Sequence, residues 1–170
     1  MTTLAESHPT RIDAPHMRQV LSHFCTGVTI VTAMGAEEPV GFTCQSFSSL
    51  SLDPPYVCFC PGKTSTTWPR IRDVGRFCVN VLAADQEELC RGFAVSGADK
   101  FAGRNWSLSP NGSPLLGSSL AWIDCTLEQE VDAGDHTIAI ARVTQLEVVR
   151  DTAPLLFYRA RFGRLAAETD

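Results

Sequence analysis

The chain has 170 residues, of which 44% are hydrophobic and 19% charged, and its formal net charge is −5. This length and composition are typical of one globular domain with a continuous core, and they exclude a disordered chain, a collagen and a repeat array. The acidic balance also argues against nucleic acid as the main ligand, because phosphate backbones are bound by clustered lysine and arginine side chains.

Seven cysteines stand at positions 25, 44, 58, 60, 78, 90 and 125. Their number is odd, most lie in apolar runs, and no secretory leader is evident, so we expect free thiols in a reducing cytoplasm. No metal site is expected, because Cys58 and Cys60 lack the further ligands of a zinc site. The apolar stretches are far shorter than the roughly 20 residues of a membrane helix, which predicts a soluble protein without a membrane partner.

The first twelve residues are polar and aperiodic, which predicts a flexible N-terminal leader over residues 1–12. A short amphipathic helix follows, because Asp13 can cap it, Pro15 suits its first turn, and apolar residues then recur at helical spacing. These apolar residues are Met17, Val20, Leu21 and Phe24. The folded domain is expected over residues 13–162, with a C-terminal tail over residues 163–170.

Runs of β-branched and aromatic residues predict a set of strands along the rest of the chain. They cover residues 28–32, 40–47, 56–60, 77–82, 121–131, 137–149 and 155–159. The turn residues 132–135 predict that the two long strands flanking them pair antiparallel.

Two further helices are expected between the strands. One covers residues 66–74 and ends at Gly75; the other is opened by Asp85, with Glu88 three residues later as in a capping box. Strands outnumber helices and do not alternate with them regularly. The pattern therefore favours a closed antiparallel barrel with appended helices over a parallel Rossmann sheet.

The segment Cys60-Pro61-Gly62-Lys63-Thr64-Ser65 leaves a predicted strand and enters a predicted helix. Backbone N–H groups, a lysine and hydroxyls at such a junction can bind phosphate, although a solvated loop capped by Ser65 or Thr66 explains the same residues. The segment is not a Walker A loop, because that motif needs glycine where the chain has Val57. No GxGxxG motif is present either, so a nicotinamide cofactor would bind without the dinucleotide fingerprint.

Polar side chains also follow the strand that begins near Gly41. Thr43, Gln45, Ser46 and Ser48 offer many donors and acceptors with no net charge, which suits the edge of a planar ligand such as a flavin; a polar strand end is the alternative. His136 is the histidine in the most suggestive position, although histidines near turns are usually solvated. Hydrolytic chemistry has no visible nucleophile or metal motif.

Eight segments in this order resemble the flavin reductase family, most closely the small reductase components of two-component flavin-dependent monooxygenases. They are residues 25–32, 41–47, 48–55, 60–65, 77–82, 99–101, 134–136 and 155–159. The resemblance implies a mainly β (α+β) fold, an antiparallel split β-barrel with Greek-key topology and a few short flanking helices. It also implies a homodimer that binds FMN or FAD non-covalently, oxidises NAD(P)H, and releases reduced flavin to a separate oxygenase component. Of the two nicotinamide donors, NADH is expected ahead of NADPH.

The same resemblance implies roles for individual residues. The flavin ring and ribityl chain would be lined by Thr43, Gln45, Ser46 and Ser48. The flavin phosphate would be held by Cys60, Pro61, Lys63 and Ser65. The pocket would be shaped by Asn80, Phe93, Lys100 and Phe101. The nicotinamide side would be faced by Tyr158 and by His136, the one candidate catalytic residue.

One departure and two alternatives accompany the resemblance. Relatives often have asparagine where this chain has Gln45, whose longer amide can reach a different flavin atom or turn away. Because a fold does not fix a function, a non-catalytic flavin-binding module and a split-barrel oxidase with a retained flavin stay open.

Overall fold

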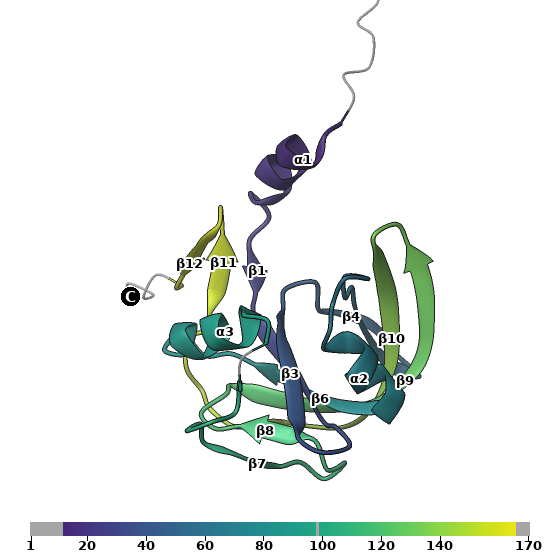
Figure 1. The fold of residues 1–170 in the computed structure, drawn as a ribbon. Coiled ribbons are helices and arrows are strands. Elements are labelled where there is room, and N and C mark those ends of the chain that lie inside the picture. Colours follow the sequence, from purple (N-terminus) through teal and green to yellow (C-terminus); the bar gives the residue numbers. More distant parts are fainter. Residues whose placement is uncertain (1–11, 98, 166–170) are drawn as a thin grey trace, which may run out of the picture.

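The computed structural model describes residues 12–97 and 99–165 of the chain. Within these residues the fold is mainly β, with antiparallel sheets and three short helices (Figure 1). The predicted leader over residues 1–12 lies outside the described residues except for Ile12, and so does the end of the predicted C-terminal tail. All seven cysteines lie in the described part and are free, as predicted.

The main sheet has seven strands in the order β3-β2-β6-β9-β10-β5-β4. The strands are β2 (Thr29–Met34), β3 (Pro39–Cys44), β4 (Ser48–Leu52), β5 (Pro55–Phe59), β6 (Arg76–Val81), β9 (Ala121–Ala133) and β10 (His136–Val148). Its end strands are β3 and β4, and no ladder between them is present in the described chain. The antiparallel mainly β prediction is therefore confirmed, whereas the closed barrel is not seen.

Two smaller sheets complete the fold. One has the order β1-β11-β12, and the other pairs β7 with β8. Their strands are β1 (Thr26–Gly27), β11 (Leu156–Tyr158), β12 (Arg161–Gly163), β7 (Trp106–Leu108) and β8 (Pro114–Leu116). Of these five strands only β11 was predicted, as part of a longer apolar run over residues 155–159. The other four were missed, because two or three residues are too few to show an alternating pattern.

The long strands follow the sequence prediction closely. β9 and β10 pair antiparallel from His136 opposite Ala133 onward, and Gly134 supplies the left-handed turn residue with φ +67°. Strand β4 is the main omission, since the strands predicted in this region cover only residues 40–47 and 56–60. Its serines and leucines carry no strong strand signal, and pairing with β5 forms the strand.

The helices are α1 (Ala14–Leu21), α2 (Trp68–Val74) and α3 (Glu87–Ala94). The Asp13 side chain caps α1 by accepting a hydrogen bond from the His16 N–H at 2.8 Å, as predicted. Gly75 ends α2 with φ +75°, also as predicted. None of these helices is long and apolar enough to cross a membrane, within the residues described.

The predicted capping box at Asp85 is wrong. Gln86 is the N-cap of α3 and makes no side-chain capping bond. Its amide instead accepts from the Ala83 N–H and donates to the Gly117 carbonyl, while Asp85 pairs with Arg150 at 3.0 Å. A long-range ion pair thus removes the carboxylate from the helix end.

Buried aromatic side chains organise the core. Phe59 contacts Trp68 and Phe77 edge to face, with ring centroids 5.2 and 5.4 Å apart. Phe93 of α3 packs on β3 at Gly41, where an added Cβ would lie 2.8 Å from the Phe93 ring. This close approach fixes α3 beside the end of β3, where it forms one wall of the site described below.

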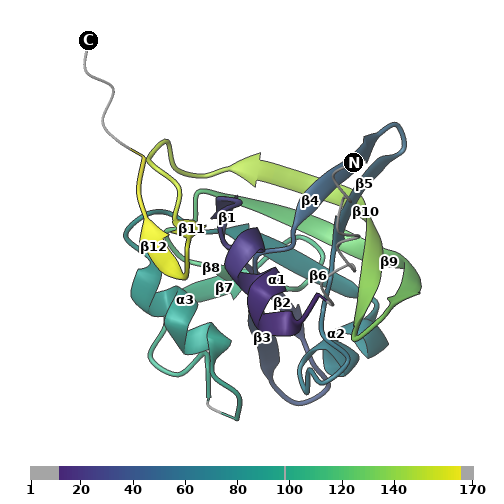
Figure 2. The same cartoon turned by 90° about the horizontal axis from the view of Figure 1, so that it is seen from above.

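Helix α1 lies apart from this core. Of the apolar residues predicted for its face, Met17, Val20 and Leu21 lie on the helix and Phe24 lies beyond its end, and each is more than half exposed. Figure 1 shows the helix standing away from the sheets, and in the view from above of Figure 2 it lies in front of them. The amphipathic helix predicted from the sequence therefore has an apolar face that nothing in the described chain covers.

Candidate functional site

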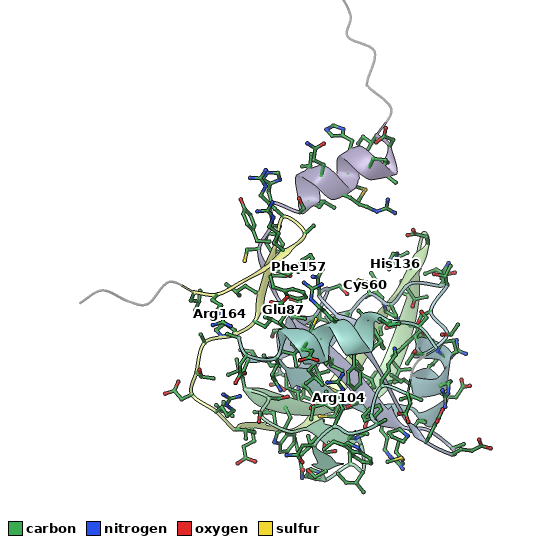
Figure 3. All side chains as sticks on the ribbon, turned by 60° about the vertical axis from the view of Figure 1, so that its left-hand side comes forward. Cys60, Glu87, Arg104, His136, Phe157 and Arg164 are labelled. Atoms are coloured by element: carbon green, nitrogen blue, oxygen red, sulfur yellow. The ribbon has the colours of Figure 1, made fainter. Side chains whose placement is uncertain are left out.

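A cleft of about 870 Å³ opens between the end of β3, the segment that follows β5, the helix α3 and the β11–β12 turn. This volume lies within the ~300–1,000 Å³ typical of small-molecule sites. Cys60, His136 and Phe157, labelled in Figure 3, come from three different parts of its wall. The cleft is therefore assembled from segments far apart in the sequence.

The first wall follows β3 and the loop after it. The Thr43 hydroxyl donates to the Cys90 carbonyl at 2.7 Å and ties β3 to α3. The Ser46 hydroxyl accepts from the Cys60 N–H at 2.8 Å and ties this loop to the end of β5. Gln45 and Ser46 are exposed, so their polar atoms remain accessible to a ligand.

The second wall is the segment from Cys60 to Thr67. Its start is tied to the β9–β10 turn, because the Thr137 N–H donates to the Pro61 carbonyl and the Lys63 N–H donates to the Asp135 carbonyl. The Ser65 hydroxyl accepts from the Trp68 N–H at 3.0 Å and thereby caps the start of α2. The hydroxyl-bearing residues on this wall of the cleft are Thr64, Ser65, Thr66 and Thr67.

His136 is the first residue of β10 and lies beside this wall. Its Nδ1 is 2.7 Å from the Asp135 carboxylate, and this hydrogen bond lowers the pKa of the Asp135 carboxyl. An ionised carboxylate only accepts, so Nδ1 carries the proton. Nε2 is the nitrogen nearer Gly62, 3.6 Å from where a Cβ on that glycine would lie. Nε2 has no hydrogen-bond partner among the residues that the structure describes and lies at the edge of the cleft.

Lys100 and Arg91 bring positive charge to the third wall. The Lys100 ammonium donates to the carbonyls of Gly41 and Phe93, both at 3.0 Å, and burial lowers its pKa. The Arg91 guanidinium lies 4.7 Å from the Phe162 ring centroid and pairs with Glu87. No aspartate or glutamate of the described residues lines the cleft. The cleft thus favours an anionic ligand in a chain of net charge −5.

Three thiols also line the cleft, those of Cys44, Cys60 and Cys90. Burial raises the pKa of the Cys44 and Cys90 thiols, so both are neutral at physiological pH. The partly exposed Cys60 lies at the end of β5. The buried thiols of Cys44 and Cys90 therefore make their part of the lining uncharged and weakly polar.

The structure brings together nine of the site residues predicted from the sequence. The residues that line the cleft are Thr43, Gln45, Ser46, Cys60, Pro61, Ser65, Phe93, Lys100 and His136. Segments separated by more than ninety positions, from Thr43 to His136, therefore meet at the cleft.

Five predicted site residues do not line the cleft. They are Ser48, Lys63, Asn80, Phe101 and Tyr158. The Lys63 ammonium pairs with Asp132 at 2.9 Å on the outside of the β9–β10 hairpin. Tyr158 follows Phe157 on β11, so it points to the opposite face, where it contacts His23. Ser48 begins β4 and lines a different hollow beside Phe24.

Asn80 and Phe101 are buried structural residues. Asn80 donates to the Ile30 carbonyl and to the Thr32 hydroxyl, and accepts from the Leu116 N–H, so its amide is used within the core. Phe101 packs edge to face on Phe93, with ring centroids 5.0 Å apart, and thereby holds in place a side chain that lines the cleft.

Sequence reasoning missed several residues of the cleft. Aromatic and cationic side chains that it did not assign are Arg91, Phe157 and Phe162, and unassigned hydroxyl residues are Thr64, Thr66 and Thr67. Phe157 and Thr64 lay in segments that carried the family resemblance. Arg91 and Phe162 had no local signal, because they meet only through the packing of α3 against β12.

Comparison with known proteins agrees with this geometry. Residues 21–166 match the model of the flavin reductase like domain. The chain is 54% identical over 151 residues to the reductase subunit HsaB of a flavin-dependent monooxygenase from Rhodococcus jostii, covering 89% of this chain and 77% of that protein.

Two solved structures are also similar. Nitrilotriacetate monooxygenase component B from Mycobacterium thermoresistibile superposes with a TM-score of 0.88 at 46% identity, covering 92% of this chain and 89% of that one. The NADH:FAD oxidoreductase SgcE6 of Streptomyces globisporus, solved with NAD and FAD fragments, has a TM-score of 0.88 at 37% identity, covering 93% and 96%. With a family match over most of its length and relatives this similar, the chain belongs to the flavin reductase family.

Proposed function

We propose that the chain is an NADH-dependent flavin reductase that reduces FMN or FAD by hydride transfer and releases the reduced flavin to a separate flavin-dependent monooxygenase. The relative named as a monooxygenase reductase subunit supports this activity, and the one named NADH:FAD oxidoreductase supports NADH as the donor. The observation that carries the proposal is the cleft, which combines aromatic walls, exposed polar side chains and cations, with no carboxylate from the described residues.

The residues of the cleft fit the two ends of a flavin. An isoalloxazine presents donors and acceptors along one edge, and the exposed Gln45 amide and Ser46 hydroxyl offer both kinds of partner. The phosphate end fits the hydroxyl-bearing wall around Thr64 and Thr66, with Lys100 as the nearby cation. In this proposal Ser48, Lys63, Asn80 and Tyr158, which do not line the cleft, make no direct contact with the flavin.

When bound, the flavin supplies the acceptor for a hydride from reduced nicotinamide. The contribution of the chain is to position the two rings, because hydride transfer needs reacting atoms roughly 3–3.5 Å apart. His136 would serve this purpose: with its Nδ1 bound to Asp135, its Nε2 would be the nitrogen that could accept a hydrogen bond from the carboxamide N–H of a nicotinamide. Phe157 and Phe162 exclude water from one side of the cleft.

Release of the product limits the affinity. A flavin that leaves after every cycle cannot be held much more tightly than about 1 μM, or about −8 kcal/mol. Exposed polar groups such as Gln45 and Thr64 suit moderate binding, since water competes for them. We therefore expect the purified protein to be partly or wholly colourless.

A kinetic experiment tests the proposal. Purified protein is mixed with NADH and increasing FMN or FAD, and NADH oxidation is followed by absorbance. The rate should rise with flavin and saturate. Tight stoichiometric flavin without turnover would instead indicate a flavin-binding module, and turnover that needs no added flavin in a yellow protein would indicate an oxidase with a retained flavin.

The assembly and location follow from the same proposal. We propose a homodimer, because α1 offers an exposed apolar face around Val20 and Leu21, and sedimentation velocity would test it.

We also propose that residues 13–162 form a split barrel of Greek-key topology in which β3 and β4 flank the opening. The seven free cysteines support a reducing cytoplasm as its compartment.

A further inference from the structure

A second cavity of about 320 Å³ borders the cleft. Thr66, Thr67 and Lys100 line both spaces, so the two cavities meet at these residues. We call the second space the side cavity; its other walls include Glu38 and Arg70. Its volume lies at the lower end of the ~300–1,000 Å³ range of small-molecule sites, which suits one nucleoside rather than a whole dinucleotide.

The charges of the two spaces differ. No carboxylate of the described residues lines the cleft, whereas Glu38 and Asp99 line the side cavity. The Arg70 guanidinium pairs with Glu38 at 3.0 Å, and the two side chains are 48% and 65% exposed, so both can reach a ligand. The side cavity thus suits a neutral polar group with hydroxyls better than a phosphate.

An adenosine has the chemistry that these residues recognise. Carboxylates accept hydrogen bonds from ribose hydroxyls, as in dinucleotide-binding folds, and arginine stacks on aromatic rings. At the junction, the hydroxyls of Thr66 and Thr67 make no hydrogen bond within the described part of the chain, and Lys100 lines the same two spaces. Phosphates can bind at this junction while the nucleoside occupies the side cavity.

We propose that the side cavity binds the adenylate half of FAD, with the pyrophosphate at Thr66, Thr67 and Lys100, so that the chain prefers FAD over FMN. The inference rests on the proposed function, which puts the phosphate end of the flavin at the hydroxyl-bearing wall. NADH also carries an adenylate. FAD is favoured because His136, on the proposed nicotinamide side, lines the cleft and does not line the side cavity.

The experiment measures the dissociation constants of FAD and FMN by fluorescence for the wild type, Arg70→Ala, Glu38→Gln and Arg72→Ala. Arg72 is the matched control, because it lies on the same helix, pairs with Asp73 and does not line the side cavity. The wild type should bind FAD about tenfold more tightly than FMN. Arg70→Ala and Glu38→Gln should weaken FAD about 5- to 10-fold and change FMN less than twofold, while Arg72→Ala changes neither.

Other results overturn the inference. Equal affinity of the wild type for FAD and FMN would mean that the side cavity does not bind the adenylate. Equal weakening of FAD and FMN binding by Arg70→Ala would mean the same. A further arm compares the Michaelis constants of NADH and reduced nicotinamide mononucleotide. If Arg70→Ala impairs NADH alone and leaves FAD binding unchanged, the side cavity belongs to NADH. A wild type that binds flavins but does not oxidise NADH would contradict the proposed function without deciding this binding comparison.

Discussion

Lys100 provides a sharp test of how the cleft is built. Its ammonium donates to the carbonyls of Gly41 on β3 and Phe93 on α3, both at 3.0 Å, and so joins two walls of the cleft. Hydrogen bonds from charged donors contribute about 1.5–3 kcal/mol each, but burial of the ammonium offsets part of this, as its lowered pKa indicates. We expect Lys100→Met to reduce the free energy of unfolding by about 2 kcal/mol.

This loss corresponds to a decrease in Tm of about 4–8 °C for a chain of this size, measurable by circular dichroism. Lys63→Met is the matched control, because the Lys63 side chain is 43% exposed and its ammonium pairs with Asp132 at the surface, where ion pairs contribute about 0–1 kcal/mol. The same two variants compare phosphate ligands: Lys100→Met should weaken FMN more than riboflavin, whereas Lys63→Met should change neither. Equal effects of the two substitutions on Tm would refute the role given to Lys100. Selective loss of FMN in Lys63→Met would make Lys63 the phosphate ligand.

Three further predictions concern single residues. His136→Ala should raise the Michaelis constant for NADH about tenfold, as expected for one lost hydrogen bond, and spare the dissociation constant of the flavin; an unchanged NADH dependence would return His136 to a turn residue. Bound FMN should slow alkylation of Cys60, which lines the cleft, and not of the exposed Cys25, as measured by peptide mass spectrometry; equal rates with and without FMN at Cys60 would contradict the site. Gly41→Ala should lower stability by about 1–3 kcal/mol in urea unfolding, because its Cβ would meet the Phe93 ring at 2.8 Å; an unaltered midpoint would show that α3 shifts freely.

The sequence predicted the parts of the fold that depend on local chemistry. The β9–β10 hairpin follows from long β-branched runs on either side of Gly134, and the end of α2 follows from Gly75 in the left-handed region. Strand β4 was missed because its residues have no alternating pattern and become a strand only by pairing with β5. Asp85 was misassigned because its partner, Arg150, is 65 positions away.

The predicted site residues also divide into those indicated by local sequence and those whose contacts depend on the packed structure. Gln45, Ser46 and Ser65 were predicted because polar residues at a strand end or helix start indicate a binding edge, and all three line the cleft. Lys63 was predicted to hold the phosphate from the family resemblance. Its salt bridge with Asp132 could not be predicted, because it depends on how the segment after β5 is bound to the β9–β10 turn. Asn80 has the composition of a ligand-binding residue, but its amide is consumed by core hydrogen bonds, which only the packed structure reveals.

The central claim is that a flavin binds reversibly in the cleft with its ring beside Gln45 and Ser46. A crystal structure of the protein grown with FMN tests it most directly. The account predicts the ring between Phe157 and the segment that begins at Cys60, with the phosphate at the threonine hydroxyls that follow. An empty cleft in crystals that hold FMN at another surface of the chain would contradict it.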